Sequence, residues 1–406
     1  MDPLYHMLAN GIRLVHIPVD SPVAHCGIFV NAGSRDETEK EHGIANFIEH
    51  TIFKGTDRRS VTQVLNRLEN VGADFNAFTG KEETCIHASF LAEYYPRTLE
   101  LFQDIFSHST FPEKDLEREK QVILDEITSY RDAPAEQIFD DFEEYLFAGH
   151  PLGRNILGTP KSLRRLKREH LLDFIRRSYR PGEMVIASVG KIDFRRLVRL
   201  TERYFGDFPD RGQSLARTPV VECKTFQVKK NRRTSQVHCI LGSPAYPYTH
   251  EKRIPLALLN NLLGGPVMNS RLSLALREKN GLTYHNESNY VMYSDAGLIL
   301  IYFGTDPVHL EKALSVVHKE VKRLREVRLS PAGLAAARKQ ITGQLAISQE
   351  SNLATMLAMG KSYLVRDRFE SIESILNRIH ATTAEEIAEI ANEIFDEANL
   401  SMLTYI

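Results

Sequence analysis

Hydrophobic residues recur at every third or fourth position through much of the chain, with charged residues between them. A period of 3.6 residues places such apolar positions on one face, which predicts amphipathic helices. The predicted helices span residues 43–55, 61–71, 94–108, 112–130, 136–147, 161–179, 193–206, 252–263 and 308–326. Terminal signals support these limits, because Pro112 suits a first turn, Thr159 is a suitable cap, and Gly55 follows a last apolar position.

Other stretches alternate apolar and polar residues or are rich in β-branched residues, which is typical of strands. Residues 11–18 and 23–32 flank a polar turn at 20–22 and are predicted to form a hairpin. Residues 74–79 and 84–90 are predicted to pair around another turn. Further strands are predicted at 184–189, 221–228, 236–241, 283–293 and 297–303.

The order of these elements indicates an internal repeat. Residues 207–219 have the composition of a linker and no apolar periodicity, and they divide the chain almost in half. A helix, two strands and a second helix follow one another in each half at similar offsets, which indicates a duplicated α+β unit. With 406 residues the chain is long enough for two or three domains. We therefore predict two domains, residues 1–210 and 211–406.

Charge and cysteine content narrow the class of protein. Lys plus Arg (51) nearly balances Asp plus Glu (53), and the net charge of −2 predicts no nucleic-acid partner and no anionic membrane partner. The four cysteines lack C-x-x-C spacing, which argues against a zinc knuckle, a redox motif or a disulfide framework. No signal-peptide pattern begins the chain, and no apolar run approaches the roughly 18 residues of a membrane span. We therefore expect a cytoplasmic protein.

The stretch G-I-A-N-F-I-E-H-T-I-F-K-G-T, residues 43–56, carries the first candidate chemistry. Asn46 and His50 are four residues apart and so share a helix face, with Glu49 beside them. A histidine at position 46 would complete H-x-x-E-H, the inverted zinc-peptidase signature in which two histidines bind zinc and the glutamate activates water. Catalytic zinc takes three protein ligands, so an acidic ligand is needed elsewhere.

The predicted helix 112–130 offers that ligand. Glu119 and Glu126 lie seven residues apart and form one stripe along this helix. From the residues alone, each candidate has an ordinary alternative. The Glu49-His50 pair could be a solvated polar face, and Glu126 could be a surface carboxylate, with Asp125 equally well placed.

Three separated motifs resemble the pitrilysin family of zinc metallopeptidases, which includes insulin-degrading enzyme and mitochondrial processing peptidase. They are residues 43–56, E-R-E-K-Q-V-I-L-D-E-I at 117–127, and L-G-G-P-V-M-N-S-R-L-S-L-A-L-R-E-K-N-G-L-T-Y at 263–284. The resemblance covers almost the whole chain and extends to residues 76–79 and 156–159. It implies the α+β class, with two tandem homologous α/β-sandwich domains whose antiparallel-rich sheets are covered by helices.

The resemblance also implies roles for the residues of the first half. His50 and Glu126 correspond to zinc ligands, and Asn46 stands where the family has its first zinc histidine. Glu49 corresponds to the general base and Glu119 to the supporting acid. The implied reaction is metal-assisted hydrolysis of peptides, in which zinc lowers the pKa of a bound water and a carboxylate takes its proton.

In the second half, the resemblance pairs Arg277 with Tyr284 as groups that contact the substrate and the developing oxyanion. Without it, Arg277 could simply pair with Glu278, and Tyr284 could be an ordinary strand aromatic. The edge-strand segment that binds substrate backbone by strand addition corresponds to Asn76, Ala77, Phe78 and Thr79.

Implied partners follow from size. The chain is half as long as the family's single-chain clamshell members, so the resemblance implies a homodimer, or a heterodimer with a homologous subunit, that encloses a chamber. Such a chamber would take peptides or unfolded polypeptides as substrates.

Asn46 is the departure from the family pattern. Its amide oxygen suits hard cations better than zinc, so we expect weak zinc binding and little peptidase activity. Asn46 could be an inactivating change introduced into an active peptidase. The chain could instead be a natural non-catalytic member that binds peptides or a partner subunit, or its site could function with another metal or geometry. Because the other motif residues are retained, the first explanation is favoured.

Overall fold

The computed structural model describes residues 2–210, 216–232 and 234–406, and the chain forms two compact units. The first unit consists of residues 1–128, 154–218 and 348–370. The second unit consists of residues 129–153, 219–347 and 371–406. The units interleave along the sequence, because each half of the chain contributes one segment to the other unit. The predicted domains meet near residue 210. The compact units differ from them in two segments, because residues 129–153 belong to the second unit and residues 348–370 to the first.

The first unit contains a six-stranded sheet in the order β1-β2-β6-β3-β5-β4. Its strands are β1 (Leu4–Met7), β2 (Arg13–Pro18), β3 (Val23–Val30), β4 (Asp74–Thr79), β5 (Thr84–Leu91) and β6 (Met184–Gly190). The predicted pairing of β4 with β5 is confirmed. The predicted hairpin of β2 and β3 is wrong, because β6 lies between them. Every residue of β6 is buried, and a strand with two buried faces belongs in the interior of a sheet.

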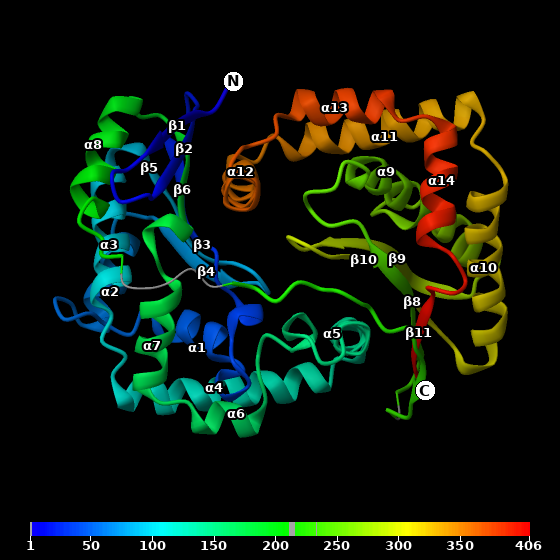
Figure 1. Cartoon of the computed structure of the whole chain (residues 1–406), viewed down its shortest axis with the longest axis horizontal. Helices are drawn as coiled ribbons and strands as arrows, with labels where there is room; N and C mark the ends of the chain where they lie inside the picture. Colours follow the sequence, from blue (N-terminus) through cyan, green and yellow to red (C-terminus); the bar gives the residue numbers. More distant parts are fainter. Residues whose placement is uncertain (1, 211–215, 233) are drawn as a thin grey trace. The chain divides into compact units, whose positions relative to one another are not determined.

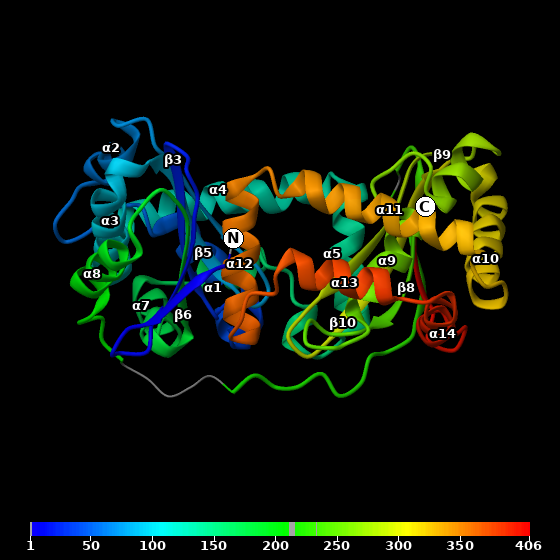
Figure 2. The same ribbon diagram turned by 90° about the horizontal axis from the view of Figure 1, so that it is seen from above.

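Helices cover both faces of this sheet (Figure 1). On one face lie α1 (Ile44–Thr51), α2 (Val61–Glu69), α3 (Tyr95–His108), α7 (Arg168–Ser178) and α8 (Phe194–Phe205). The opposite face is covered by α12 (Asn352–Arg366), which comes from the second half of the chain. This helix lies close to the sheet because Gly360 has no side chain, and a Cβ there would lie 2.1 Å from the Phe29 ring. Seen from above, α3 and α8 lie side by side (Figure 2).

The predicted helix 161–179 is two helices, α6 (Pro160–Arg165) and α7. Thr159 caps α6 as predicted. The extended residues Leu166 and Lys167 separate the two helices, and His170 Nδ1 accepts a hydrogen bond from Lys167 N at 3.0 Å. The apolar pattern did not mark this break, because a new capping interaction ends one helix and starts the next without changing which side chains are buried.

The second unit contains a five-stranded sheet in the order β7-β11-β8-β10-β9. Its strands are β7 (Gln227–Lys230), β8 (Val237–Ala245), β9 (Thr283–Met292), β10 (Gly297–Thr305) and β11 (Ser401–Tyr405). Its helices are α5 (Pro134–Leu146), α9 (Arg253–Gly264), α10 (Leu310–Glu326), α11 (Pro331–Ser348), α13 (Ile372–Ala381) and α14 (Ala384–Ile394). The strand predicted at 221–228 is wrong except at its end, because β7 starts at Gln227 and Val221 is 93% exposed. The predicted α+β class is confirmed in both units.

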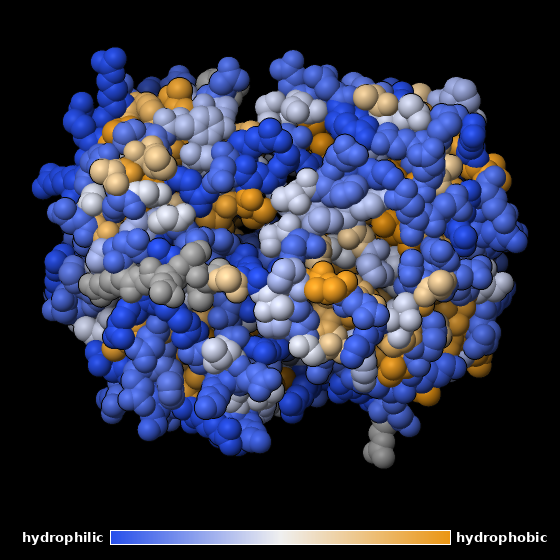
Figure 3. Space-filling model, viewed as in Figure 1, coloured by the Kyte–Doolittle hydropathy of each residue, from blue (hydrophilic) through white to orange (hydrophobic). Residues whose placement is uncertain are grey.

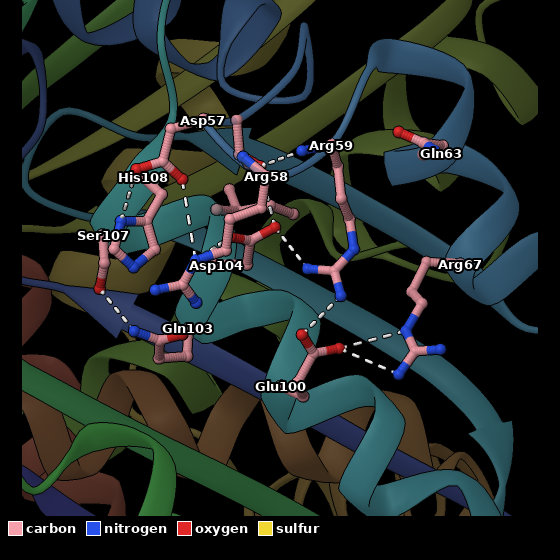
Figure 4. Close-up of polar contacts among 12 residues, drawn as sticks. Asp57, Arg58, Arg59, Gln63, Arg67, Glu100, Gln103, Asp104, Ser107 and His108 are labelled. Carbon is pink, nitrogen blue, oxygen red and sulfur yellow. Dashed lines mark hydrogen bonds and ion pairs between the residues drawn. The ribbon is translucent and has the colours of Figure 1, made fainter.

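A buried ion-pair network holds the loop that follows α1 (Figure 4). Asp104 on α3 is fully buried and accepts hydrogen bonds from Thr56 Oγ1 at 3.0 Å and from Arg59 at 2.5 Å. Arg59 also bonds Glu100 at 2.6 Å, and Glu100 bonds Arg67. The loop between α1 and α2 is thereby fixed to α3.

The face drawn in Figure 3 is largely hydrophilic, with apolar residues in small separated groups. In the described part of the chain, no helix combines the length and apolar character needed to cross a membrane.

Candidate active site

The candidate site lies in the first unit, where the short helix α1 faces the long helix α4 (Glu113–Arg131). α1 begins after Gly43, whose φ of +93° belongs to the left-handed region that favours glycine. Eight residues follow, and their apolar members Ile44, Phe47 and Ile48 are fully buried. This burial turns the remaining face of α1, with Glu49 and His50, toward α4.

The structure brings together His50 and the two glutamates of the predicted stripe. His50 Nε2 lies 3.5 Å from Glu126 Oε2, and His50 Nδ1 lies 3.7 Å from Glu119 Oε2. The second oxygen of Glu119 pairs with Lys54 Nζ at 2.7 Å. Glu119 is therefore held between a lysine and a histidine, while Glu126 is more exposed, at 45% of its side chain. The spacing of seven residues on α4 is what directs both carboxylates to one imidazole.

Glu49 lies beside this group on α1 and is partly buried. Burial raises the pKa of the Glu49 carboxyl, and the charge of Glu126 acts in the same direction. Hydrogen bonds with Thr79 and the charge of His50 oppose the increase in the pKa. A carboxyl whose pKa is raised toward neutrality is suited to exchanging a proton with a substrate or water.

Asn46 lies one turn before His50 and is 6% exposed. Its Nδ2 is fully buried and has no hydrogen-bond acceptor in the described structure. A buried amide donor without an acceptor costs about 1–3 kcal/mol of stability. The surroundings of Asn46 therefore do not satisfy an asparagine side chain.

The predicted substrate segment forms the edge strand β4. Asn76, Ala77, Phe78 and Thr79 are all in β4, which pairs only with β5 within the sheet. Ala77 N donates a hydrogen bond to Asn76 Oδ1 at 2.8 Å. β4 also packs against α1, so this edge lies beside the helix that carries Glu49 and His50.

Arg277 and Tyr284 belong to the second unit. Arg277 lies in a π-helical segment, Ser273–Glu278, and its Nε is 3.6 Å from Glu278 Oε1. Tyr284 is in β9 and is 89% exposed. The contact between Arg277 and Glu278 is the ordinary alternative that the sequence left open. A role of either residue in substrate binding stays a prediction.

The residues present do not fit a catalytic zinc ion. Within the described residues, no three His, Cys, Asp or Glu side chains come together in an arrangement that could hold a metal. His50 and Glu126 supply two donors, and the third position is the neutral amide of Asn46. Catalytic zinc takes three protein ligands of the imidazole, thiolate or carboxylate type.

Sequence reasoning missed two residues that shape this site. Lys54 follows His50 by four residues, and that spacing could have placed it near the same carboxylates, although α1 ends before it. Glu37 lies in an irregular segment with no periodic pattern, and no sequence signal places it at the start of α1, where it accepts hydrogen bonds from Gly43 N and Ala45 N.

A glutamate and a histidine on one helix that face a glutamate stripe on another, within a pair of sandwich-like α+β units, are features of a metallopeptidase-type protein. Family comparison agrees with this class. Residues 15–160 match the model of the insulinase family, peptidase family M16, and residues 165–341 match the model of the peptidase M16 inactive domain. The chain belongs to peptidase family M16, which confirms the resemblance to the pitrilysin family.

Full-length relatives and solved structures agree. An uncharacterized zinc protease of Bacillus subtilis is 32% identical over 390 residues, covering 96% of this chain and 94% of the relative. One of Rickettsia felis is 31% identical over 399 residues, covering 98% and 96%. A protease structure from Helicobacter pylori has a TM-score of 0.93 at 20% identity, covering 100% of this chain and 99% of that chain. A peptidase M16 inactive domain from Pseudomonas fluorescens has a TM-score of 0.91 at 20% identity, covering 100% and 98%.

Proposed function

We propose that this chain binds extended peptides and, because it carries Asn46, hydrolyses them slowly or not at all. The observation that carries the proposal is Asn46, whose amide stands where the family's zinc site has a histidine. With His50 and Glu126 alone, the centre lacks one of the three donors of a catalytic zinc site. The related zinc proteases support a peptidase ancestry, and Glu49 and Glu119 are still present.

Peptide binding is proposed at the β4 edge. A strand at the edge of a sheet offers unpaired backbone groups, and an extended peptide can add to it through main-chain hydrogen bonds. The bond from Ala77 N to Asn76 Oδ1 is local, so an incoming strand can replace it. Binding of this kind depends little on peptide sequence, which suits unfolded polypeptides as ligands.

Restoring the missing donor tests the proposal. We expect the purified chain to hold far less than one zinc per chain and to leave a quenched fluorogenic peptide uncleaved. Asn46→His should bind zinc stoichiometrically and cleave the peptide, whereas Asn46→Ala, which adds no donor, should do neither. Stoichiometric zinc and brisk cleavage by the unchanged chain would contradict the proposal.

A second measurement separates binding from hydrolysis. Peptide affinity, measured by fluorescence anisotropy, should survive a metal chelator in the unchanged chain. Ala77→Pro removes a backbone donor from β4 and should weaken this binding, because proline cannot donate to an added strand. Unchanged affinity in this variant would rule out strand addition at Ala77.

A natural non-catalytic subunit is the competing function. It is favoured if Asn46→His binds zinc yet cleaves no peptide, because the remaining catalytic groups would then be out of place. Glu49, His50, Glu119 and Glu126 are all retained and lie near one another. This favours a peptidase-type protein that is impaired by Asn46.

A further inference from the structure

The start of α1 lacks a capping side chain of its own. The first turn of an α-helix has N–H groups without partners inside the helix, and a side chain at the N-cap usually satisfies one or two of them. The N-cap of α1 is Gly43, which has no side chain. A helix of eight residues also has little stability of its own, so its position depends on outside contacts.

Glu37 supplies the missing cap from a different segment. Its Oε2 accepts a hydrogen bond from Gly43 N at 2.8 Å, and its Oε1 accepts one from Ala45 N at 2.9 Å. Glu37 is only 4% exposed, so both bonds are shielded from water. Each carboxylate oxygen is therefore used to hold one backbone N–H of the first turn.

The segment that follows residue 153 fixes both Glu37 and the helix start. Arg154 donates a hydrogen bond from its guanidinium to Glu37 O at 2.8 Å. Gly158 packs directly on Gly43, since a Cβ on Gly158 would lie 2.8 Å from Gly43 Cα. The backbone start of α1 is thus enclosed by Glu37 on one side and Gly158 on another.

We propose that Glu37 is a positioning residue that fixes α1, and with it Asn46, Glu49 and His50, relative to the carboxylates of α4. Glu37 does not touch the reacting groups. It acts through the backbone of Gly43 and Ala45, which lies next to Asn46 and about one turn before Glu49 and His50. The effect of Glu37 on metal binding rests on the proposed function. The effect of Glu37 on the stability of the helix α1 does not.

Amide hydrogen exchange of the unchanged chain and its variants tests the effect of Glu37 on α1. We expect Glu37→Ala to speed exchange in residues 43–52 by about 10-fold or more, because two buried hydrogen bonds to the first turn are lost. Glu37→Gln has the same shape but one acceptor oxygen, so its exchange should lie between the unchanged chain and Glu37→Ala. A residue that only fills space would give equal exchange in Glu37→Gln and the unchanged chain.

A matched control excludes a general loss of stability. Glu82 is a carboxylate of the same unit, 5% exposed, that pairs with Arg35 at 2.6 Å and with Arg217 at 3.5 Å. Glu82→Gln should leave exchange in residues 43–52 close to that of the unchanged chain. Equal effects of Glu82→Gln and Glu37→Gln on this segment would overturn the proposal.

Zinc affinity in the Asn46→His background tests the effect of Glu37 on metal binding. There we expect Glu37→Ala to weaken zinc binding about 10- to 100-fold, the usual effect of losing a group that orients a ligand. Glu82→Gln should change it much less, and unchanged affinity in Glu37→Ala would overturn the link to the metal. If Asn46→His itself binds no zinc, the proposed function fails, and the exchange measurements still decide the role of Glu37.

Discussion

At the scale of single residues, Asn46 has a buried amide nitrogen without a hydrogen-bond acceptor in the described structure. Its buried Nδ2 finds no acceptor, although His50, Glu49 and Glu126 lie around the same helix face. Because an unpaired buried donor lowers stability, this amide carries a local energetic cost.

His16 gives a prediction for the pH dependence of stability. Burial lowers the pKa of His16 to about 4, against 6.5 for an exposed histidine. Between these pH values the unfolded chain binds more protons than the folded chain, so the free energy of unfolding rises with pH. Acidification from pH 7 to 4 should cost about 3 kcal/mol through this residue. Urea denaturation across this pH range measures the effect.

The matched variant His16→Gln isolates the contribution of His16 from other titrating groups. The stability of His16→Gln should therefore depend less steeply on pH below 6.5. Parallel pH profiles for the two proteins would show that His16 does not titrate in this way.

Residue-level prediction succeeded where a helical repeat carried the information. Glu119 and Glu126 could be placed on one face from their spacing alone, and the structure brings both to His50. Glu37 could not be found, because its contact with α1 depends on the path of an irregular segment. No pattern of apolar positions encodes such a path.

At the scale of elements, most helices and strands between residues 11 and 326 were predicted, but not all of their neighbours. β1 and the elements after residue 326, which are α11 to α14 and β11, were not predicted. β2 and β3 were predicted correctly as strands, yet β6, more than 150 residues later in the chain, separates them. The local pattern of apolar residues indicates which side chains are buried and whether a segment is a helix or a strand. The order of strands in a sheet depends instead on long-range packing. α12 was not predicted as a helix, and nothing in its own pattern assigns it to the first unit.

The network around Asp104 predicts a large loss of stability on mutation. Asp104→Ala removes the acceptor of Thr56 and Arg59, while Arg59, which is 20% exposed, keeps Glu100. Leaving a buried donor without its acceptor typically costs about 1–3 kcal/mol. Urea denaturation followed by circular dichroism should show a loss of this size.

An exposed ion pair of the same unit provides the control. Arg176 and Asp173 lie 2.8 Å apart with more than half of each side chain exposed. Arg176→Ala should change the free energy of unfolding by no more than about 0.5 kcal/mol. Similar losses for the two variants would mean that the buried network around Asp104 contributes no more than a surface pair.

At the scale of the whole molecule, the exchange of segments makes each unit depend on both halves of the chain. α12 buries Met356 and Met359 against the first sheet, and α5 buries Phe142 in the core of the second unit. Removing either helix would expose an apolar sheet face. A fragment ending at the predicted boundary of residue 210 would therefore lack a layer of its own core.

We expect the chain to form a homodimer. The matched relatives are of nearly the same length as this chain. If such chains enclose peptides in a chamber, as the resemblance to the longer clamshell peptidases implies, two copies are needed to form it. We expect light scattering after size-exclusion chromatography to give twice the mass of the chain at micromolar concentration. A single species with the mass of one chain would contradict the homodimer, and a complex formed only with a homologous subunit would identify a heterodimer instead.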